Sequence, residues 1–317
     1  MKKILLTGGA GFVGSALIQE FLTLGYAVRV YDNFGRDVLS AKNIQSPYLE
    51  IVKGDVLNYE DVLAATRGCQ LVIHCAAVAG IDTVLKSPTT TMRVNLTGTM
   101  NVLEAAREAG GVELFINFST SEVFGTSAWG AVETQSAVTG SVGEARWIYA
   151  VGKLAGEHVA HAYYSEHRLP VVTVRPFNVY GPGQVGEGAI HGFVRHAIRG
   201  EDLIIYGEGN QIRAWCYIDD FVEAIKLILR CPDAIGESFN IGNARAVVTV
   251  YGLAEAIIRI TGSKSRILFQ PARSVDIELR VPKVDKALRI LGFASKVDLE
   301  EGIRRTADYY RELDGIA

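Results

Sequence analysis

The strongest constraint on the fold is a glycine-rich turn that directly follows the first apolar run, Ile4–Thr7. Residues 7–14 read Thr-Gly-Gly-Ala-Gly-Phe-Val-Gly. In such a turn Gly8 permits a tight bend, Gly11 lets a pyrophosphate approach the backbone, and Gly14 allows close packing of helix on strand. The N-terminus of the helix offers free N–H groups and partial positive charge to phosphates. The turn therefore predicts a βαβ unit that binds a dinucleotide.

Apolar runs alternate with helical stretches through the first half of the chain. The runs have no polar face, as expected of parallel strands that helices cover on both sides. The predicted strands are Ile4–Thr7, Ala27–Tyr31, Leu71–Cys75, Leu114–Phe118 and Val171–Val174, and the predicted helices are Phe12–Leu24, Tyr59–Thr66, Met92–Ala109 and Trp147–His167. Gly25, Gly68 and Gly110 lie where helices should end. This alternation predicts an α/β fold with a doubly wound parallel sheet of the Rossmann type.

The pattern loosens after Pro176, where glycine-rich turns separate shorter elements. The clearest helices there are Ile190–Arg199, Asp220–Leu229, Val250–Thr261 and one that starts at Leu299. We expect residues 1–175 to form the Rossmann domain and residues 176–317 a smaller substrate-binding lobe, with some segments returning to the first sheet. Residues 125–146 lack periodicity and exceed a typical connection, which indicates a functional loop.

Composition excludes several classes of function. The 317 residues carry 32 Lys and Arg against 35 Asp and Glu, and 49% are hydrophobic, enough for a large core. The near-neutral balance disfavours nucleic acid or an anionic membrane as the main partner. No apolar run approaches the roughly 18 residues of a membrane helix. The four cysteines lack ligand-like spacing, so we expect reduced thiols in a cytoplasmic protein and no metal site.

Acidic residues follow the second and third apolar runs. Asp32, 18 residues past Gly14, is expected to accept hydrogen bonds from the adenosine ribose. Its charge would repel a 2′-phosphate, which favours NAD over NADP, although the nearby Arg36 would offset that repulsion. Asp55, after the run at 51–53, has two interpretations: it meets the adenine edge, or it caps the next turn.

A tyrosine and a lysine mark the expected catalytic end. Tyr149 and Lys153 are four residues apart on a predicted helix and share one face. A neighbouring ammonium and a positive nicotinamide ring lower the pKa of a tyrosine enough for it to take a proton from a sugar hydroxyl. Residues 119–122, Ser-Thr-Ser-Glu, lie at the C-terminal end of a predicted strand, where open α/β sheets bind ligands.

One set of motifs runs in order through nearly the whole chain. It comprises Gly8-x-x-Gly11-x-x-Gly14, Asp32, Asp55, His74-Cys75-Ala76-Ala77, Asn95, Ser119-Thr120-Ser121 and Tyr149-x-x-x-Lys153. This set resembles the extended short-chain dehydrogenase/reductase family. The segments 175–182 (Arg-Pro-Phe-Asn-Val-Tyr-Gly-Pro) and 213–220 (Arg-Ala-Trp-Cys-Tyr-Ile-Asp-Asp) resemble its nucleotide-sugar branch.

The resemblance implies a cofactor, a substrate and residue roles. NAD is the implied cofactor, and a nucleotide sugar, most simply a UDP-sugar, is the implied substrate. Tyr149 is the implied base, Lys153 also holds the nicotinamide ribose, and Thr120 bonds the 4-hydroxyl of the sugar. Asn178 and Arg213 hold the diphosphate, and the guanidinium fork of an arginine suits phosphate oxygens. The expected cofactor-binding residues are Gly8, Gly11, Phe12, Val13, Gly14, Asp32, Asn33, Asp55, Val56, Ala76, Ala77, Asn95, Ser119, Tyr149 and Lys153.

Members of this branch oxidise the sugar at C4 and then diverge. A 4-epimerase turns the ketone over, a 4,6-dehydratase removes the C5 proton and expels the C6 hydroxyl, and a decarboxylase releases a C6 carboxylate as carbon dioxide. Many 4-epimerases carry a small neutral residue at the position of Glu122. The tripeptide 120–122, Thr-Ser-Glu, resembles UDP-glucuronate decarboxylases and also GDP-mannose 4,6-dehydratases.

Two further segments favour decarboxylation. Residues 146–149 (Arg-Trp-Ile-Tyr) and 276–282 (Asp-Ile-Glu-Leu-Arg-Val-Pro) resemble the bacterial UDP-glucuronate decarboxylase of the aminoarabinose pathway, in which the arginine matching Arg280 lies near the departing carboxylate. Two roles are open to Arg280: it holds the carboxylate of a uronate, or it donates a proton toward C5. The expected catalytic residues are Tyr149, Lys153, Thr120, Ser121, Glu122 and Arg280. The alternatives are a UDP-sugar 4-epimerase, a 4,6-dehydratase and a non-catalytic NAD-binding regulator.

The two long helices carry further expectations. In the resembling family the helices that match 92–109 and 147–167 pair across a two-fold axis into a four-helix bundle, so the resemblance implies a homodimer. The pattern Glu157-His158-x-x-His161 would supply only part of a metal coordination shell, and we expect no metal there.

Overall fold

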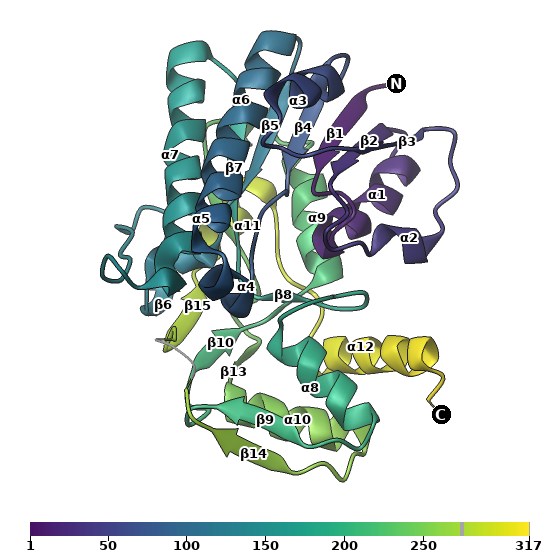
Figure 1. Cartoon of the computed structure of the whole chain (residues 1–317), viewed down its shortest axis with the longest axis vertical. Helices are drawn as coiled ribbons and strands as arrows, with labels where there is room; N and C mark the ends of the chain where they lie inside the picture. The colour runs from purple at the N-terminus through teal and green to yellow at the C-terminus, as the bar shows by residue number, and fades with distance from the viewer. Residues whose placement is uncertain (273–275, 317) are drawn as a thin grey trace.

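The computed structural model describes residues 1–272 and 276–316. Its largest feature is a seven-stranded sheet whose strands all run parallel to their neighbours. In spatial order these strands are β12 (Ser238–Ile241), β7 (Val171–Pro176), β5 (Leu114–Phe118), β4 (Leu71–His74), β1 (Lys3–Thr7), β2 (Ala27–Asp32) and β3 (Leu49–Lys53). Helices cover both faces of the sheet (Figure 1). The predicted doubly wound Rossmann fold is therefore confirmed.

Neighbouring side chains on each strand pack into two separate cores, because successive residues of a strand point to opposite faces. In β1, Ile4 and Leu6 pack into one core and Leu5 packs into the other. The first core is covered by α1 (Phe12–Thr23), α9 (Ile218–Ile228) and α11 (Asp285–Leu291), and the second by α3 (Tyr59–Thr66), α6 (Gly98–Ala109) and α7 (Ile148–His167). Burial on both faces explains why the strands read as uninterrupted apolar runs.

Most residues after Pro176 form the lower part of the molecule in Figure 1, but β12 returns to the edge of the large sheet beside β7. The lower strands are β13 (Val247–Thr249), β10 (Ile212–Ala214), β15 (Leu279–Pro282) and β6 (Ser127–Ala131) in one sheet, and the pairs β8 (Val179–Tyr180) with β11 (Cys216–Tyr217) and β9 (Leu203–Tyr206) with β14 (Ile267–Gln270). The lower helices are α8 (Ala189–Ile198), α10 (Val250–Thr261) and α12 (Leu299–Asp314). The helices expected after Pro176 are confirmed to within two residues.

The predicted helix Met92–Ala109 is wrong at its start. Helix α5 (Pro88–Met92) begins four residues earlier, with a proline in its first turn, where the missing N–H of proline is tolerated. A π-helical segment, Arg93–Thr97, then joins α5 to α6. Within this wider turn the amide of Asn95 exchanges hydrogen bonds with the backbone of Val78, a distant contact that no local pattern reveals.

The segment 125–146 is not irregular throughout, contrary to the expectation from its sequence. Ser127–Ala131 form β6, which pairs with β15 from the far end of the chain. A 3₁₀ turn at Ala145–Trp147 leads into α7, which therefore begins one residue later than predicted. The strand was missed because its five residues include Gly and two Ala, and its partner lies far away in sequence.

The remaining short elements are α2 (Leu39–Lys42), α4 (Ile81–Lys86) and 3₁₀ turns at Ser121–Phe124 and Pro232–Ala234. Within residues 1–272 and 276–316, no helix has the length and apolar character needed to cross a membrane. The same residues contain no group of three or more His, Cys, Asp or Glu side chains arranged to hold a metal ion.

Candidate active site

A cavity of about 410 Å³ opens at the carboxyl ends of β1 and β4. The direction in which successive strands are added to the large sheet reverses between β1 and β4. Strands β2 and β3 extend the sheet beyond β1, whereas β5 and β7 extend it in the opposite direction, beyond β4. Open α/β sheets bind ligands at such a switch point. The position of the cavity therefore follows from the topology.

The glycine-rich turn shapes one wall of this first cavity. Gly8 has φ = +71°, and a Cβ atom there would lie 2.5 Å from the backbone nitrogen of Ala76. A Cβ atom on Gly14 would collide with the carbonyl oxygen of Gly8. Gly11 precedes α1 and no side chain caps that helix. Backbone N–H groups of the first turn of α1 thus stay available to a pyrophosphate, and the turn fits a dinucleotide.

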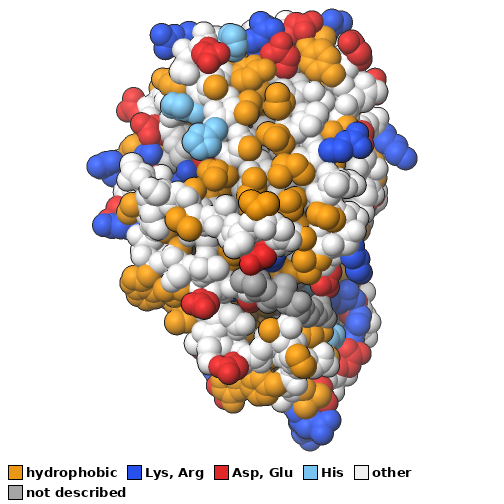
Figure 2. Space-filling view, turned by 60° about the vertical axis from the view of Figure 1, so that its left-hand side comes forward, with side chains coloured by type: hydrophobic (Ala, Val, Ile, Leu, Met, Phe, Trp, Pro, Cys, Tyr) orange, Lys and Arg blue, Asp and Glu red, His pale blue; other side chains and the backbone are white. Residues whose placement is uncertain are grey.

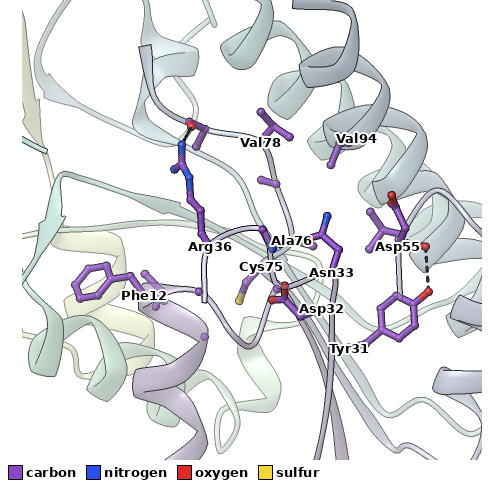
Figure 3. A pocket seen from close by; sticks show the side chains of 18 of the residues that line it. Phe12, Tyr31, Asp32, Asn33, Arg36, Asp55, Cys75, Ala76, Val78 and Val94 are labelled. Atoms are coloured by element: carbon purple, nitrogen blue, oxygen red, sulfur yellow. Dashed lines mark hydrogen bonds between the residues drawn. The ribbon is translucent and has the colours of Figure 1, made fainter. Parts of the chain in front are cut away.

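The end of β2 forms another part of the wall (Figure 3). The carboxylate of Asp32 accepts hydrogen bonds from the backbone N–H groups of Ala10, at 2.9 Å, and Phe34, at 2.8 Å. These bonds hold the carboxylate at the cavity, where it can accept further hydrogen bonds from a ribose. Arg36 also lines the cavity, but its guanidinium extends away from Asp32 and donates to the carbonyl of Ala79 at 2.9 Å (Figure 3).

Eleven of the expected cofactor-binding residues line this cavity. They are Gly8, Gly11, Phe12, Val13, Gly14, Asp32, Asn33, Asp55, Val56, Ala76 and Ala77. Asp55 also accepts a hydrogen bond from the N–H of Leu57 at 2.9 Å, so it lines the cavity and caps the next turn. Asn95 lies behind the wall, where its amide bonds both polar groups of the Val78 backbone at 2.8 and 2.9 Å. Ser119, Tyr149 and Lys153 do not line the cavity.

Sequence reasoning missed several residues of this wall. Tyr31 donates a hydrogen bond to the carbonyl of Asp55 at 3.0 Å (Figure 3). Gly54 leaves room for the ring of Tyr31, because a Cβ atom there would collide with it. Cys75 and Val94 also line the cavity, Cys75 beside Ala76 (Figure 3). The signal for Tyr31 was its place beside Asp32 at the end of an apolar run.

A second cavity, of about 540 Å³, lies between the large sheet and the lower part of the molecule. All three expected substrate-binding residues line it, namely Asn178, Arg213 and Arg280, as does Glu122. Arg146 also lines it, although the sequence used this residue only as part of a resembling segment. The three arginines are buried, with exposed fractions of 4 to 8%. Their three positive charges outnumber the two negative charges of Glu122 and Asp276 at this end of the cavity.

Glu122 lies between two of these arginines. It belongs to the 3₁₀ turn at the end of β5, and its backbone N–H donates to the hydroxyl of Thr120 at 3.2 Å. One carboxylate oxygen accepts a hydrogen bond from Arg146, and the other lies 3.4 Å from Arg280. Burial opposes ionisation, but the charges of Arg280 and Arg146 prevail and hold the pKa of Glu122 below its ordinary value.

The three substrate-binding residues expected from the sequence, Asn178, Arg213 and Arg280, belong to one polar cluster in the second cavity. Arg213 lies 3.3 Å from the carboxylate of Asp276, and burial lowers the pKa of Arg213 to about 10. Arg280 donates to the side-chain oxygen of Asn178 at 3.2 Å. The Nε atoms of Arg146 and Arg280 are buried and have no hydrogen-bond partner among residues 1–272 and 276–316. A buried donor without a partner is costly, so the cluster is suited to an anionic ligand that accepts these bonds.

The expected catalytic pair lies on α7 beside the end of β5. The pKa of Tyr149 rises to about 12, first because of burial and then because of the charge of Glu122, while Thr120 acts against the rise. Lys153 is buried, donates to the carbonyl of Phe118, and has its pKa lowered to about 8 by burial. Burial is therefore the dominant influence on the pKa of Tyr149, and the expected lowering requires the positive nicotinamide ring as well as Lys153.

Ser121 is the remaining residue of the expected catalytic set. Ser121 is buried in the 3₁₀ turn beside Glu122.

The second cavity also has a wall that sequence reasoning did not single out, with His196, Tyr206, Gln211 and Trp215 among its residues. They come from α8, β9 and the segments before and after β10, so only the tertiary fold brings them together.

Comparison with known proteins identifies the family. A model of the NAD-dependent epimerase/dehydratase family matches residues 4–242. A UDP-N-acetyl-alpha-D-glucosaminuronate decarboxylase of Bacillus cytotoxicus is 32% identical over 323 residues, covering 99% of both chains.

Two solved structures are similar over the same extent. The UDP-glucose 4-epimerase of Thermotoga maritima with UDP-glucose has a TM-score of 0.90 at 29% identity, covering 98% of this chain and 99% of that one. The UDP-glucuronic acid 4-epimerase of Bacillus cereus with UDP-glucuronic acid and NAD has a TM-score of 0.89 at 28% identity, with the same coverage. These matches confirm the resemblance seen in the sequence. With its glycine-lined dinucleotide cavity, the chain belongs to the NAD-dependent epimerase/dehydratase family of enzymes and uses NAD as its cofactor.

Proposed function

We propose that this enzyme binds a UDP-uronate across the two cavities and decarboxylates it. The observation that carries the proposal is the set of three buried arginines around Glu122. A UDP-uronate brings two anionic groups, a diphosphate and a C6 carboxylate, whereas a neutral UDP-hexose brings only the first. Two guanidinium Nε atoms at this end of the cavity have no partner in the described part of the chain, which supports the binding of a second anion.

Oxidation at C4 is assigned to side chains on α7 and at the end of β5. Tyr149 accepts the proton of the 4-hydroxyl, and Thr120 orients that hydroxyl. When bound, NAD would supply the hydride acceptor and, in its oxidised form, a positive charge that favours ionisation of the tyrosine. Lys153 stays protonated up to about pH 8 and holds the ribose of the cofactor with the N–H groups that Phe118 leaves free.

The arginine cluster has the chemistry needed for the second step. A sugar with a ketone at C4 and a carboxylate on C5 is a β-keto acid. Its C5–C6 bond breaks, carbon dioxide leaves, and the electron pair passes to the C4 oxygen as an enolate. Arg280 and Arg146 orient the carboxylate before this step, and C5 then takes up a proton. The hydride taken from C4 would then return to C4 and the proton from Tyr149 to its oxygen, so that the 4-hydroxyl is restored and NAD is regenerated. Arg213 and Asn178 hold the diphosphate away from the reacting carbon.

A 4-epimerase is the second candidate, and the ion pairs of Glu122 favour it. Both of its carboxylate oxygens are engaged by Arg146 and Arg280. A 4,6-dehydratase needs a free carboxylate to remove the C5 proton, but a 4-epimerase does not. In that case Glu122 orders the two arginines and does not act on the sugar.

Product analysis by mass spectrometry tests the proposal. The enzyme is given UDP-glucuronate, UDP-glucose or GDP-mannose with catalytic NAD. We expect a UDP-glucuronate product lighter by one carbon dioxide. An isomer of unchanged mass with a new chromatographic position would replace the proposal with 4-epimerisation, and loss of water would replace it with dehydration. Glu122→Gln should impair decarboxylation far more than it would impair a simple 4-epimerisation.

We also propose an organisation for the whole protein. Residues 1–175 hold the cofactor, residues 176–317 hold the nucleotide sugar, and β12 is a segment of the second part that returns to the first sheet. The chain forms a homodimer through α6 and α7. Figure 2, which brings this side of the molecule forward, shows a band of apolar side chains along it, and Met100 on α6 and Val151 on α7 are exposed. Four free cysteines support a cytoplasmic location.

A further inference from the structure

We propose that Glu157 and Arg175 are positioning residues for the catalytic side chains of this enzyme. Their ion pair joins α7, which carries Tyr149 and Lys153, to the carboxyl ends of β5 and β7. The inference rests on the proposed function, because it assumes that Tyr149 and Lys153 act on substrate and cofactor.

The pair is buried and has bidentate geometry. Glu157 and Arg175 are each 8% exposed. The Nε of Arg175 lies 3.0 and 3.1 Å from the two carboxylate oxygens of Glu157, and an Nη atom donates to one of them at 2.6 Å. The other Nη atom donates to the carbonyl of Glu133 at 3.0 Å. Such a fork adds geometric specificity to its energy, so the carboxylate of Glu157 has one defined position.

Glu157 is also bonded directly to the end of β5. The hydroxyl of Ser119 donates to one of its carboxylate oxygens. Ser119 follows Phe118, whose carbonyl accepts a hydrogen bond from Lys153, and precedes Thr120, which lies beside Tyr149. Strand end and helix are therefore joined at two points, one helical turn apart on α7, through the two residues that directly precede Thr120.

The spacing on α7 places these contacts on one face. Tyr149, Lys153 and Glu157 follow each other at intervals of four residues, which is about one helical turn. A shift of α7 along the end of β5 would move the tyrosine hydroxyl relative to Thr120. It would also break the Ser119 contact, so the ion pair and the catalytic spacing are geometrically linked. The charge of Glu157 in addition favours the protonated form of Lys153.

Stability alone is a poor explanation for this pair. Removing two charges from water costs about as much as their attraction returns, so an apolar pair of similar volume is often equally stable. Directional contacts are what an apolar pair would lack. The pattern Glu157-His158-x-x-His161 was considered above as part of a metal site. In this structure the carboxylate of Glu157 is instead bonded by Arg175 and Ser119.

The first test is Glu157→Gln, which preserves shape and removes the charge. We expect kcat with UDP-glucuronate to fall about tenfold to a hundredfold, because small displacements of reacting groups have effects of this size. The KM for UDP-glucuronate and the content of bound NAD should stay within about threefold of the original enzyme. Glu166→Gln makes the same chemical change at an exposed position of α7 and should leave kcat, KM and NAD content unchanged.

The second test separates positioning from stability. The double variant Glu157→Leu/Arg175→Met replaces the ion pair with apolar residues, and denaturant unfolding measures its stability. We expect stability close to that of the original enzyme and a kcat that stays low. A stable double variant with normal kcat would overturn the inference. So would a Glu157→Gln enzyme whose kcat is unchanged, or one whose loss of activity matches its loss of NAD.

Failure of this inference is distinguishable from failure of the proposed function. If Tyr149→Phe keeps full turnover, the proposed catalytic roles are wrong and the positioning role has nothing to act on. If Tyr149→Phe is inactive and Glu157→Gln is fully active, the proposed function stands and the positioning role is wrong.

Discussion

At the scale of single residues, burial changes the chemistry that each side chain offers. His74 lies in β4 with its ring nitrogens 2.7 and 2.9 Å from the hydroxyls of Thr7 and Thr99. Burial lowers the pKa of His74 to about 3, so it is a neutral packed side chain, as its place in an apolar run indicated. Burial likewise raises the pKa of Tyr149 to about 12. The base role proposed for Tyr149 therefore requires a further positive charge, such as that of the oxidised cofactor, to lower this pKa.

Replacement of Tyr149 by phenylalanine tests the base assignment. The change removes only a hydroxyl, so kcat should fall about 10²- to 10⁴-fold, the usual contribution of general base catalysis. Binding of NAD should be retained, because Tyr149 does not line the first cavity. Steady-state kinetics and the absorbance of bound cofactor measure the two effects. Substantial residual turnover would show that another group takes the proton.

Two glycines in helices offer a matched pair of substitutions. Gly14→Ala should lower the free energy of unfolding by about 1–3 kcal/mol and weaken NAD binding, since its Cβ atom would collide with Gly8. Gly192→Ala, in α8, meets nothing within 4 Å and should be neutral or stabilise by up to about 1 kcal/mol. Urea unfolding of both variants checks the difference. Equal effects would mean that α1 can move away from the turn.

At the scale of elements, a few polar contacts join helices whose apolar faces are already packed. The hydroxyl of Tyr163 on α7 donates to Glu104 on α6 at 2.8 Å, and Arg107 pairs with the same carboxylate. These contacts lower the pKa of Glu104 to about 2, with the hydrogen bond from Arg107 as the largest cause. The two helices on the second core are therefore joined by a bond that depends on ionisation of Glu104.

The sign of the pH effect follows from that pKa. A carboxyl whose pKa is lower in the folded state stabilises the protein above its ordinary pKa, and this contribution is lost as pH falls toward about 2. Glu104→Gln should therefore lower stability at neutral pH and reduce the decline of stability below about pH 4.5. Urea unfolding at several pH values measures both. Glu312→Gln, at an exposed position of α12, is the control, and an equal change there would contradict the prediction.

At the scale of the whole molecule, the cavities depend on segments that are far apart in the chain. Arg280 in β15 lies beside Arg213 in β10 in the same parallel pair, and Arg280 lies 3.4 Å from the carboxylate of Glu122, which follows β5. The second cavity thus exists only when the lower sheet docks on the large one. The exposed residues Met100 on α6 and Val151 on α7 line neither cavity, and this side of the molecule carries the proposed dimer contact.

Sedimentation velocity at micromolar concentration tests the dimer. We expect twice the monomer mass for the original chain. The double variant Met100→Glu/Val151→Glu should shift the protein toward monomer, because charges on both helices would be buried by the contact. Leu313→Glu changes an exposed apolar residue of α12 and should leave the dimer intact. A monomer for the original chain would contradict the proposal.

The sequence by itself determined the elements whose residues carry a local physical requirement. The strands of the large sheet are apolar on both faces, and the turn at Gly8 needs a positive φ that glycine adopts without strain. The first cavity could be predicted for the same reason, because most of its predicted residues directly follow strands β1 to β4. Local pattern is sufficient where a single strand end supplies the contact.

Only the tertiary structure decided how separate segments meet. It pairs β6 with β15, places Arg146 and Arg280 on opposite oxygens of Glu122, and sends Lys153 to the carbonyl of Phe118. Each of these contacts joins residues far apart in sequence, and their energies depend on distances and burial that no local periodicity encodes. The charge environment of the catalytic end is for this reason a property of the folded chain.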